Sequence, residues 1–209
     1  MKSIAIYIDV PVATFRQSHA REYGQTYPYP PHSTVYGLLL SLVGEMDMQK
    51  HCGVQLAIAM LSQPEKSKTL RTLHRFKFKQ EEHLANKRPD YQEILTDIRF
   101  IVWVKSGNNK TNPSLPERLE QALLNPDSVN RWGVLYLGES DDLVNIIKLV
   151  SDDFSVKSRQ WLIQDNNGWI TLPYWVDHFG FKGTHWLRYR LETISCLSPP
   201  KLAWTTIQD

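Results

Sequence analysis

Residues 27 to 45 read Tyr-Pro-Tyr-Pro-Pro-His-Ser-Thr-Val-Tyr-Gly-Leu-Leu-Leu-Ser-Leu-Val-Gly-Glu. Proline fixes φ and stiffens the first part, and the apolar run after it predicts a helix over 34–43 that ends near Gly44. Ser33 or Thr34 is expected to cap this helix. The next acidic residue is Glu45, so no carboxylate in the first turn neutralises the positive end of the helix dipole. Such a helix start favours the binding of an anion.

Strands are predicted on both sides of this helix. Large apolar residues occupy every second position at 4–10, at 54–60 and at 98–104, which is typical of strands with one buried face. Ser114, followed three residues later by Glu117, is a capping-box pattern and predicts a second helix that runs to about Leu124.

A fourth strand is predicted at 134–137, followed by a helix that Ser140 caps and that carries apolar residues at helical spacing, namely Leu143, Ile146, Ile147 and Val150. The order strand, helix, strand, strand, helix, strand predicts an α+β, ferredoxin-like fold of the RRM type. In that fold two helices cover one face of a four-stranded antiparallel sheet. Gly138 is expected where the corner needs a residue without Cβ or where another backbone comes close.

An insertion at about 65–97 separates the second and third strands and is expected to project as a thumb-like hairpin. Its residues 65–88 hold eight basic and three acidic residues, a net charge of +5 in a chain whose total is +2. This concentration of positive charge is typical of a polyanion site, and the alternative is a solvated basic hairpin without a partner.

The chain is expected to form one unit, with an RRM-like domain over 1–155 and β-hairpins over 156–209 packed on it. Turn sequences separate tryptophans in this second part, which are assigned to a core or a protein interface: Trp161, Trp169, Trp175 and Trp186. The two cysteines lack metal-site spacing, and no apolar run reaches membrane-spanning length. A cytoplasmic protein without a membrane partner is therefore expected.

Cationic and aromatic side chains surround the expected helix start. A nucleic-acid phosphate is the favoured anion, because bases can stack on nearby rings while the cations hold the backbone. Gly37 lies within the helix, where glycine costs about 1 kcal/mol relative to alanine. Either close packing on the sheet or the approach of a protein or RNA backbone would explain it. The candidate RNA-binding residues are Arg16, His19, Arg21, Tyr23, Ser33, Thr34, Tyr36, Gly37, Arg71, His74, Arg75, Lys77, Lys79 and Arg88.

Catalysis is the weaker hypothesis. His19, His32 and His74, with Tyr23 and Tyr36, could cleave RNA by general acid-base chemistry, but nothing in the sequence fixes two of these groups at hydrogen-bonding distance. No metal site or cofactor is expected, because Asp177-His178 and His185 lack a second pair of ligands.

Several motifs resemble the fifth family of CRISPR-associated proteins, in its DevS-type variant of type I systems. They are Ala13-Thr-Phe-Arg, Arg21-Glu-Tyr, Tyr27-Pro-Tyr-Pro-Pro-His-Ser-Thr-Val-Tyr-Gly-Leu-Leu, Leu42-Val-Gly-Glu, Arg88-Pro-Asp-Tyr-Gln-Glu and Tyr136-Leu-Gly-Glu-Ser. The similarity extends over nearly the whole chain.

The resemblance implies a RAMP-superfamily subunit of a Cascade effector that caps the 5′ handle of the guide RNA (crRNA), with its thumb over the first guide nucleotides. It implies as neighbours the backbone subunit and the large subunit, and it allows contact with target DNA near the protospacer-adjacent motif. Antiviral defence and RNA-guided transposition both stay open. One branch of the family processes precursor crRNA as a metal-independent endoribonuclease, but this chain lacks a clear counterpart of that branch's catalytic set, so a non-catalytic role is expected. The third hypothesis is a protein scaffold that binds no RNA.

Overall fold

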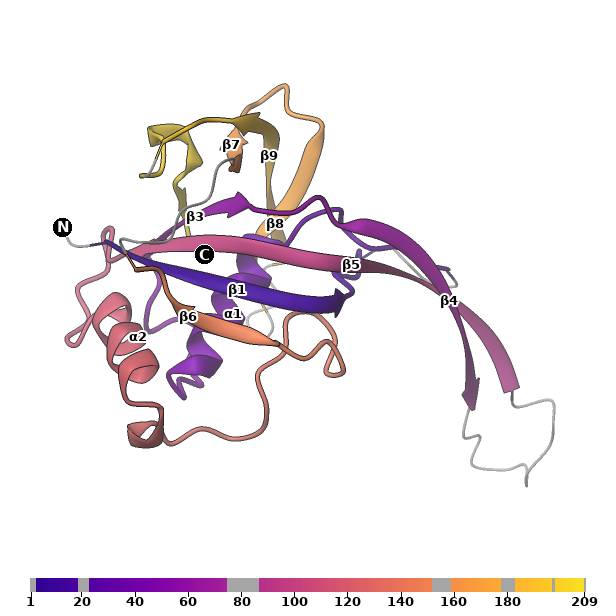
Figure 1. The fold of residues 1–209 in the computed structure, drawn as a ribbon, viewed down its shortest axis with the longest axis horizontal. Helices are drawn as coiled ribbons and strands as arrows, with labels where there is room; N and C mark the ends of the chain where they lie inside the picture. The colour runs from indigo at the N-terminus through magenta and orange to yellow at the C-terminus, as the bar shows by residue number, and fades with distance from the viewer. Residues whose placement is uncertain are drawn as a thin grey trace.

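A computed structural model of the chain describes residues 3–18, 23–74, 87–151, 159–177, 183–196 and 198–208. Two helices and a large, mainly antiparallel sheet make up the described part (Figure 1). The expected boundary near residue 155 lies outside the described residues. The elements in chain order are β1 (Ser3–Ala13), β2 (Tyr23–Gly24), α1 (His32–Leu42), β3 (Gln55–Met60), β4 (Glu65–His74), β5 (Lys87–Lys105), α2 (Leu115–Leu124), β6 (Ile146–Leu149), β7 (Gln160–Gln164), β8 (Ile170–Val176), β9 (Thr184–Thr193) and β10 (Thr205–Thr206).

Four antiparallel strands form the central part of the sheet in the order β6-β1-β5-β3. Val102 of β5 pairs with Ile6 of β1 on one side and with Ile58 of β3 on the other. The predicted mixed α/β fold with an antiparallel sheet is thus confirmed. Strand β5 lies between the two strands that α1 connects, which is the interleaving that a split βαβ arrangement requires.

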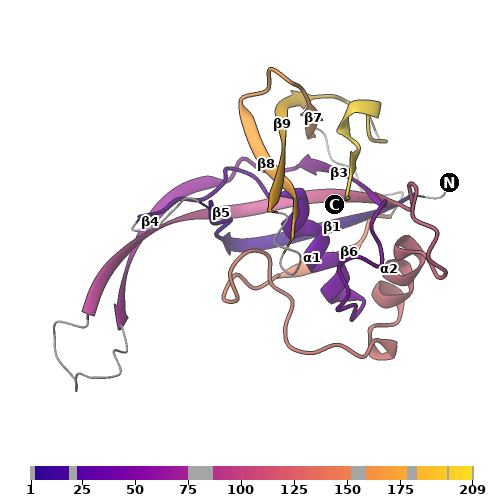
Figure 2. The ribbon, with the colours of Figure 1, turned by 180° about the vertical axis from the view of Figure 1, so that it is seen from behind.

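The main core lies between one face of this sheet and the two helices. Ile4, Ile6, Ile8 and Val10 point to this face because alternate residues of a strand share a side, and they pack with residues of both helices. Figure 2 shows α1 and α2 on the same side of the strands. The capping box of Ser114 and Glu117 is present at the start of α2, as predicted.

The C-terminal strands extend the sheet beyond β3 in the order β7-β9-β8, and β8 contacts α1. Helix α1 is therefore covered by the central sheet and by β8, which explains why seven of its eleven residues are buried. On the opposite face of the sheet, Trp161 packs on Trp103 with 4.7 Å between ring centroids. Trp161 and Trp175 are core residues, as expected, whereas Trp169 and Trp186 are exposed.

The prediction for 134–150 is wrong. Residues 134–137 form only a single β-bridge, between Tyr136 and Leu143, and the expected helix is replaced by a turn and strand β6. Short apolar runs fit helical and strand spacing equally well, and pairing with β1 decides the outcome.

The corner before β6 is closed by Asp142 rather than capped by Ser140. Its carboxylate accepts hydrogen bonds from the backbone amides of Thr14 and Glu139, both at 2.8 Å. Gly138 has a φ of +117°, and a Cβ there would lie 2.6 Å from the Thr14 carbonyl oxygen. Both expected reasons for a glycine therefore apply.

Strands β4 and β5 continue beyond the central sheet as a hairpin that projects from the body of the protein, here called the arm (Figure 1). The predicted hairpin between the second and third core strands is confirmed. Strand β5 spans 19 residues and belongs to both the core sheet and the arm. Among the described residues, no helix is long and apolar enough to cross a membrane.

Candidate nucleic-acid interface

One face at the base of the arm carries a row of three large side chains. Tyr91 of β5 pairs in register with Leu70 of β4 on one side and with Tyr23 of β2 on the other. Residues paired in this way share a face of the sheet. The exposed fractions of Leu70 and Tyr91 are 59% and 50%, so both side chains are accessible to another molecule. We call these three residues the aromatic row, after its two tyrosines.

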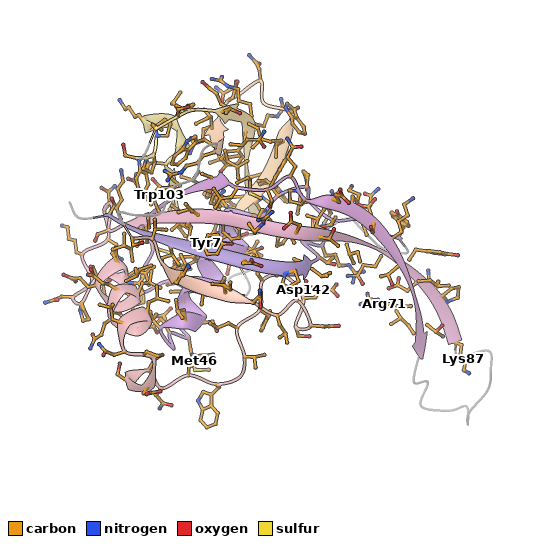
Figure 3. All side chains as sticks on the ribbon, in the orientation of Figure 1. Tyr7, Met46, Arg71, Lys87, Trp103 and Asp142 are labelled. Carbon is orange, nitrogen blue, oxygen red and sulfur yellow. The ribbon has the colours of Figure 1, made fainter. Side chains whose placement is uncertain are left out.

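Lysines flank the aromatic row. The Lys68 ammonium lies 5.4 Å from the centroid of the Tyr23 ring, and its side chain is exposed. Lys87 lies at the distal end of the described part of the arm (Figure 3). Rings beside flexible cations can stack on bases and hold phosphates at the same time.

Glu93 fixes the position of the row. Its carboxylate accepts hydrogen bonds from the Tyr23 hydroxyl at 3.2 Å and from the Thr26 amide at 3.1 Å, and it pairs with Lys66 at 3.1 Å. Burial acts to raise the pKa of Glu93, but the Thr26 amide, Lys66 and Tyr23 together lower it. The lowered pKa favours the ionised form of Glu93, and its hydrogen bonds attach the segment around Tyr23 to β5.

Arg71, a predicted RNA ligand, is already paired with two carboxylates of the protein. Its guanidinium lies 3.2 Å from the Asp90 carboxylate and 3.2 Å from the Glu139 carboxylate. Two carboxylates already neutralise this cation, so it is a fixed contact between the arm and the loop before β6 and not a free phosphate ligand. The sequence could not show this, because Glu139 is distant along the chain.

The structure describes only some of the other cations that the sequence predicts to bind RNA. Arg16 is exposed, and its backbone bridges to Thr26 near the aromatic row. Arg88 is half-buried in the arm opposite Leu73. The structure describes the backbone of His74 at the end of β4 but not its side chain, and the remaining predicted cations lie outside the described residues: His19, Arg21, Arg75, Lys77 and Lys79.

The start of α1 has the predicted charge but not the predicted cap. Pro31 is the N-cap residue, no side chain caps the helix, and the first turn holds no acidic residue. The Ser33 hydroxyl instead donates to the Pro173 carbonyl oxygen at 3.1 Å, so the cap prediction is wrong. The missing carboxylate leaves the positive end of the dipole unneutralised by the helix itself.

Gly37 lies on the open side of α1. It is exposed, and a Cβ added there would have no atom within 4 Å. Close packing on the sheet therefore does not explain this glycine. Thr34, three residues earlier on the same side, is half-buried.

Tyr36 and His32 are core residues and not surface ligands. Tyr36 is fully buried, and its hydroxyl donates to the Met48 carbonyl oxygen at 2.8 Å. The buried His32 ring stacks on Tyr189 with 4.9 Å between centroids, and burial lowers its pKa to about 3. Neither can stack on a base or shuttle protons to RNA, so the predicted stacking role of Tyr36 is wrong and the catalytic set loses two members.

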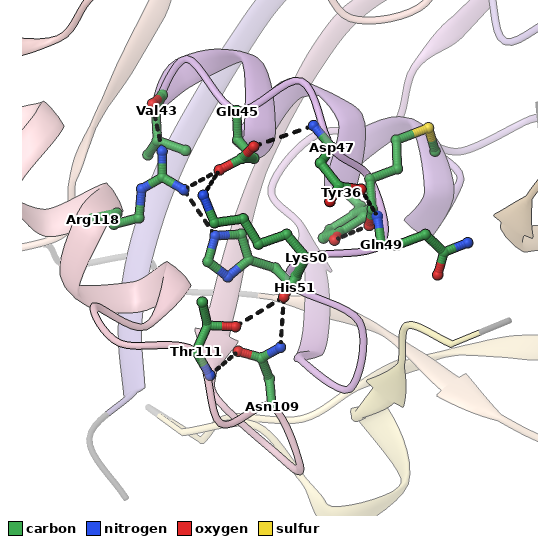
Figure 4. A network of polar contacts seen from close by, with 11 residues as sticks. Tyr36, Val43, Glu45, Asp47, Gln49, Lys50, His51, Asn109, Thr111 and Arg118 are labelled. Atoms are coloured by element: carbon green, nitrogen blue, oxygen red, sulfur yellow. Dashed lines mark hydrogen bonds and ion pairs between the residues drawn. The ribbon is translucent and has the colours of Figure 1, made fainter.

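A polar network holds the end of α1 against α2 (Figure 4). Arg118 of α2 donates to the Val43 carbonyl oxygen at 3.0 Å and pairs with Glu45 at 2.6 Å, while Lys50 pairs with the same carboxylate at 2.6 Å. A cation beside the last carbonyls of a helix complements its dipole. This network therefore positions α1.

A separate question is whether the protein could hold a metal ion. Among the described residues, no group of three or more histidine, cysteine, aspartate or glutamate side chains could do so.

Sequence reasoning missed Tyr91 and Lys68. Tyr91 stands in the Arg88-Pro-Asp-Tyr-Gln-Glu motif, but its exposure follows from the register between β4, β5 and β2. The alternation along β4 was the available signal, because it places Lys68 and Leu70 on one face.

Comparisons with known proteins agree with this fold. No model of a known protein family matches the chain. The chain is 38% identical over 194 residues to "CRISPR-associated protein Cas5" of Myxococcus xanthus (strain DK1622), covering 91% of each protein.

Two solved structures share the fold. One, described as "CRISPR RNA-guided surveillance complex", has a TM-score of 0.64 and 13% identity over 92% of this chain and 90% of the other. The second, described as "Crystal structure of Cas protein", has a TM-score of 0.58 and 16% identity over 92% of this chain and 94% of the other. The degree of identity to the Myxococcus protein over nearly its full length decides the family: the chain belongs to the Cas5 proteins of CRISPR systems.

Proposed function

We propose that this protein is a non-catalytic, guide-RNA-binding subunit of a CRISPR Cascade effector, in which it caps the 5′ handle of the crRNA. Membership of the Cas5 family and the shared fold with a chain of an RNA-guided surveillance complex support a subunit of this kind. The observation that carries the RNA-binding step is the aromatic row, in which Leu70 and Tyr91 are exposed, with Lys68 beside it on the basic arm.

Each part of the site supplies a different interaction. Tyr91 and Tyr23 offer ring faces for bases, and Lys68 and Lys87 offer exposed cations for phosphates. Arg16 and the backbone amides near Ser33 and Thr34 would bind handle phosphates, helped by the unneutralised start of α1. The exposed Gly37 leaves room for a sugar-phosphate backbone beside α1.

The cations outside the described residues have the same proposed role. We assign His19 and Arg21 to the handle, and we assign His74, Arg75, Lys77, Lys79 and Arg88 to the first guide nucleotides under the arm. The backbone subunit and the large subunit of the effector are the proposed protein neighbours, with target DNA near the protospacer-adjacent motif.

Binding is favoured over RNA cleavage. A metal-independent ribonuclease needs two titratable groups that reach the same phosphate, and His32 and Tyr36 are enclosed in the core. We therefore expect the purified chain to leave its own repeat RNA intact in the absence of metal.

Tyr91→Ala tests the proposed site. Loss of one stacked base costs about 1–3 kcal/mol, so affinity for a fluorescent 5′-handle RNA should fall at least fivefold in anisotropy titrations. Tyr91→Phe should bind like the wild type, because the ring is kept. Tyr136→Ala is the matched control, since Tyr136 is exposed to a similar extent, 46% against 50%, but lies outside the arm. Equal affinity of Tyr91→Ala and wild type would refute the role of the row.

A further inference from the structure

Trp186 of β9 presents an exposed ring on the C-terminal strands. Successive side chains of a strand point to opposite faces, and Leu187 and Tyr189 pack in the main core. Trp186 therefore points away from that core, and its exposed fraction is 44%. Its indole N–H donates to the Tyr27 hydroxyl at 3.3 Å. Because the only polar atom of the side chain is already bonded, what the tryptophan offers to another molecule is a flat apolar ring in a fixed orientation.

A cation lies on the same face of β9. Arg188 is exposed, and its Nη1 donates to the Asn166 carbonyl oxygen at 3.3 Å, which is a neutral acceptor. In the described part of the chain no carboxylate pairs with this guanidinium. The next arginine on this face differs, because Arg190 pairs with Asp165 at 2.8 Å and with Glu192 at 2.6 Å. Arg188 thus keeps its charge for another molecule, and Arg190 does not.

Two contacts place this ring beside the proposed RNA site. Tyr27, which accepts the hydrogen bond from Trp186, follows Tyr23 of the aromatic row by four residues, so the two are at most about 14 Å apart. In β8, Pro173 is the register partner of Trp186, and its carbonyl oxygen accepts a hydrogen bond from Ser33 at the start of α1, at 3.1 Å. An RNA strand that contacts the aromatic row and the start of α1 would therefore pass close to the Trp186 ring.

We propose that Trp186 and Arg188, here called the β9 pair, bind a further nucleotide of the crRNA handle. An unpaired base stacks on the Trp186 ring, and Arg188 holds a phosphate next to it. Aromatic rings beside cations are the usual means by which proteins bind single-stranded RNA. The proposal rests on the proposed function and deepens it, because it adds a base contact that belongs neither to the arm nor to α1.

The charges favour RNA over a partner protein at the β9 pair. Of the cations at the aromatic row, Lys66 is paired with Glu93, whereas Lys68 has no carboxylate partner in the described part of the chain. Cations without a carboxylate partner therefore flank the rings at both places. A polyanion that also carries flat bases matches this combination. A protein interface is the alternative, since tryptophan and arginine are also enriched there.

Photocrosslinking in the effector, assembled on its guide RNA, tests this placement. Guide RNAs carry 5-iodouridine at one handle position at a time, because this base crosslinks to aromatic rings that it contacts. One position should label the peptide that contains Trp186. Labelling of the arm but never of that peptide would overturn the proposal and leave the proposed function standing. No labelling of this chain at any handle position would overturn both.

A crosslinker on the protein separates RNA from a partner protein. Thr171 of β8 is exposed and pairs in register with Arg188, so both lie on one face. The substitution Thr171→p-benzoylphenylalanine should give a crosslink to the guide RNA. A crosslink to another polypeptide in its place would overturn the proposal in favour of a protein interface.

Substitution of the ring tests its contribution to binding. Trp186→Ala should lower the affinity for handle RNA by about fivefold or more in anisotropy titrations, and Trp186→Phe should keep most of it. Trp132→Ala is the matched control, because Trp132 is 86% exposed in the connection between α2 and β6. Wild-type affinity in a folded Trp186→Ala variant, with weaker binding by Tyr91→Ala, would overturn the proposal and not the proposed function.

The two arginines provide a second test that leaves the tryptophan in place. Arg188→Ala should make the slope of log affinity against log salt less steep by about 0.7, the contribution of one phosphate contact on a single strand. Arg190→Ala should leave the slope nearly unchanged, because two carboxylates already pair with that cation. This comparison decides the matter if Trp186→Ala does not fold by circular dichroism. Equal slopes for Arg188→Ala and wild type would overturn the proposal.

Discussion

Arg71 of the arm bonds to Glu139 of the loop before β6 at 3.2 Å, across 68 positions of the sequence. The same guanidinium pairs with Asp90 in the neighbouring strand of the arm at 3.2 Å. This contact joins the basic arm to the acidic connection between α2 and β6. It therefore helps to set the direction in which the arm projects from the body of the protein. It also pairs within the protein the charge of Arg71, which we predicted from the sequence to bind RNA.

Arg71 and Lys68 should differ in how they affect the salt dependence of RNA binding. Each phosphate contact contributes about −0.7 to the slope of log affinity against log salt for a single strand. Lys68→Ala should make the slope less steep by about that amount, while Arg71→Ala should leave it nearly unchanged. Anisotropy titrations with 5′-handle RNA at several salt concentrations measure both slopes.

Stability provides the control for this comparison. Arg71→Ala leaves the mostly buried Asp90 carboxylate without its cation and should lower the free energy of unfolding by about 1 kcal/mol. Lys68→Ala should change it little, because the Lys68 side chain is exposed. A large change of slope in Arg71→Ala would show that RNA displaces Glu139 or Asp90 from Arg71.

Gly37→Ala separates the two explanations of this helical glycine. A Cβ at this position meets no atom within 4 Å, so alanine should stabilise the helix by about 1 kcal/mol, visible as a higher urea midpoint. If a sugar-phosphate backbone passes this turn, RNA affinity should fall in the same variant. A more stable variant with unchanged RNA affinity would exclude α1 from the RNA site.

Gly138→Ala should have the opposite effect on stability. The φ of +117° disfavours any residue with a Cβ, and the added atom would lie 2.6 Å from the Thr14 carbonyl oxygen. A loss of roughly 2 kcal/mol or more is expected from strain and displacement of β1. Urea unfolding checks this, and an unchanged midpoint would mean that the corner shifts without cost.

Local sequence patterns correctly predicted two kinds of element. One kind is fixed by contacts between residues close in sequence, and the other shows a long alternation of apolar and polar residues. Strand β1 and the capping box of α2 are examples, because pairing and capping follow from side-chain period and spacing. The absence of acidic residues from the first turn of α1 could also be predicted from the sequence, since it depends only on which residues follow Pro31.

The errors come from contacts that no local pattern contains. Tyr36 and His32 look like surface residues of a helix start, but β8 and β9, about 140 to 160 residues later, cover them. Likewise, residues 146–149 have apolar spacing that suits a helix, and only their pairing with β1 makes them a strand. Tyr91 becomes a site candidate only when the register of three strands is known.

His32 should make the stability of the protein depend on pH. Burial lowers its pKa to about 3 in the folded protein, while an unfolded histidine titrates near 6.5. Between these values the unfolded chain binds a proton that the folded chain does not, so stability rises with pH and is lost as pH falls below 6.5. From pH 7.5 to pH 5 this group alone should remove about 2 kcal/mol from the free energy of unfolding.

The variant His32→Phe isolates this contribution. Phenylalanine keeps a ring that can stack on Tyr189 and has no titratable nitrogen, so the variant should lose about 2 kcal/mol less than wild type over that range. Urea unfolding of both proteins at pH 7.5 and pH 5 provides the comparison, with circular dichroism to verify the fold of the variant. Parallel losses in the two proteins would mean that the His32 ring can reach solvent or a proton acceptor, and that β8 and β9 do not keep this ring enclosed.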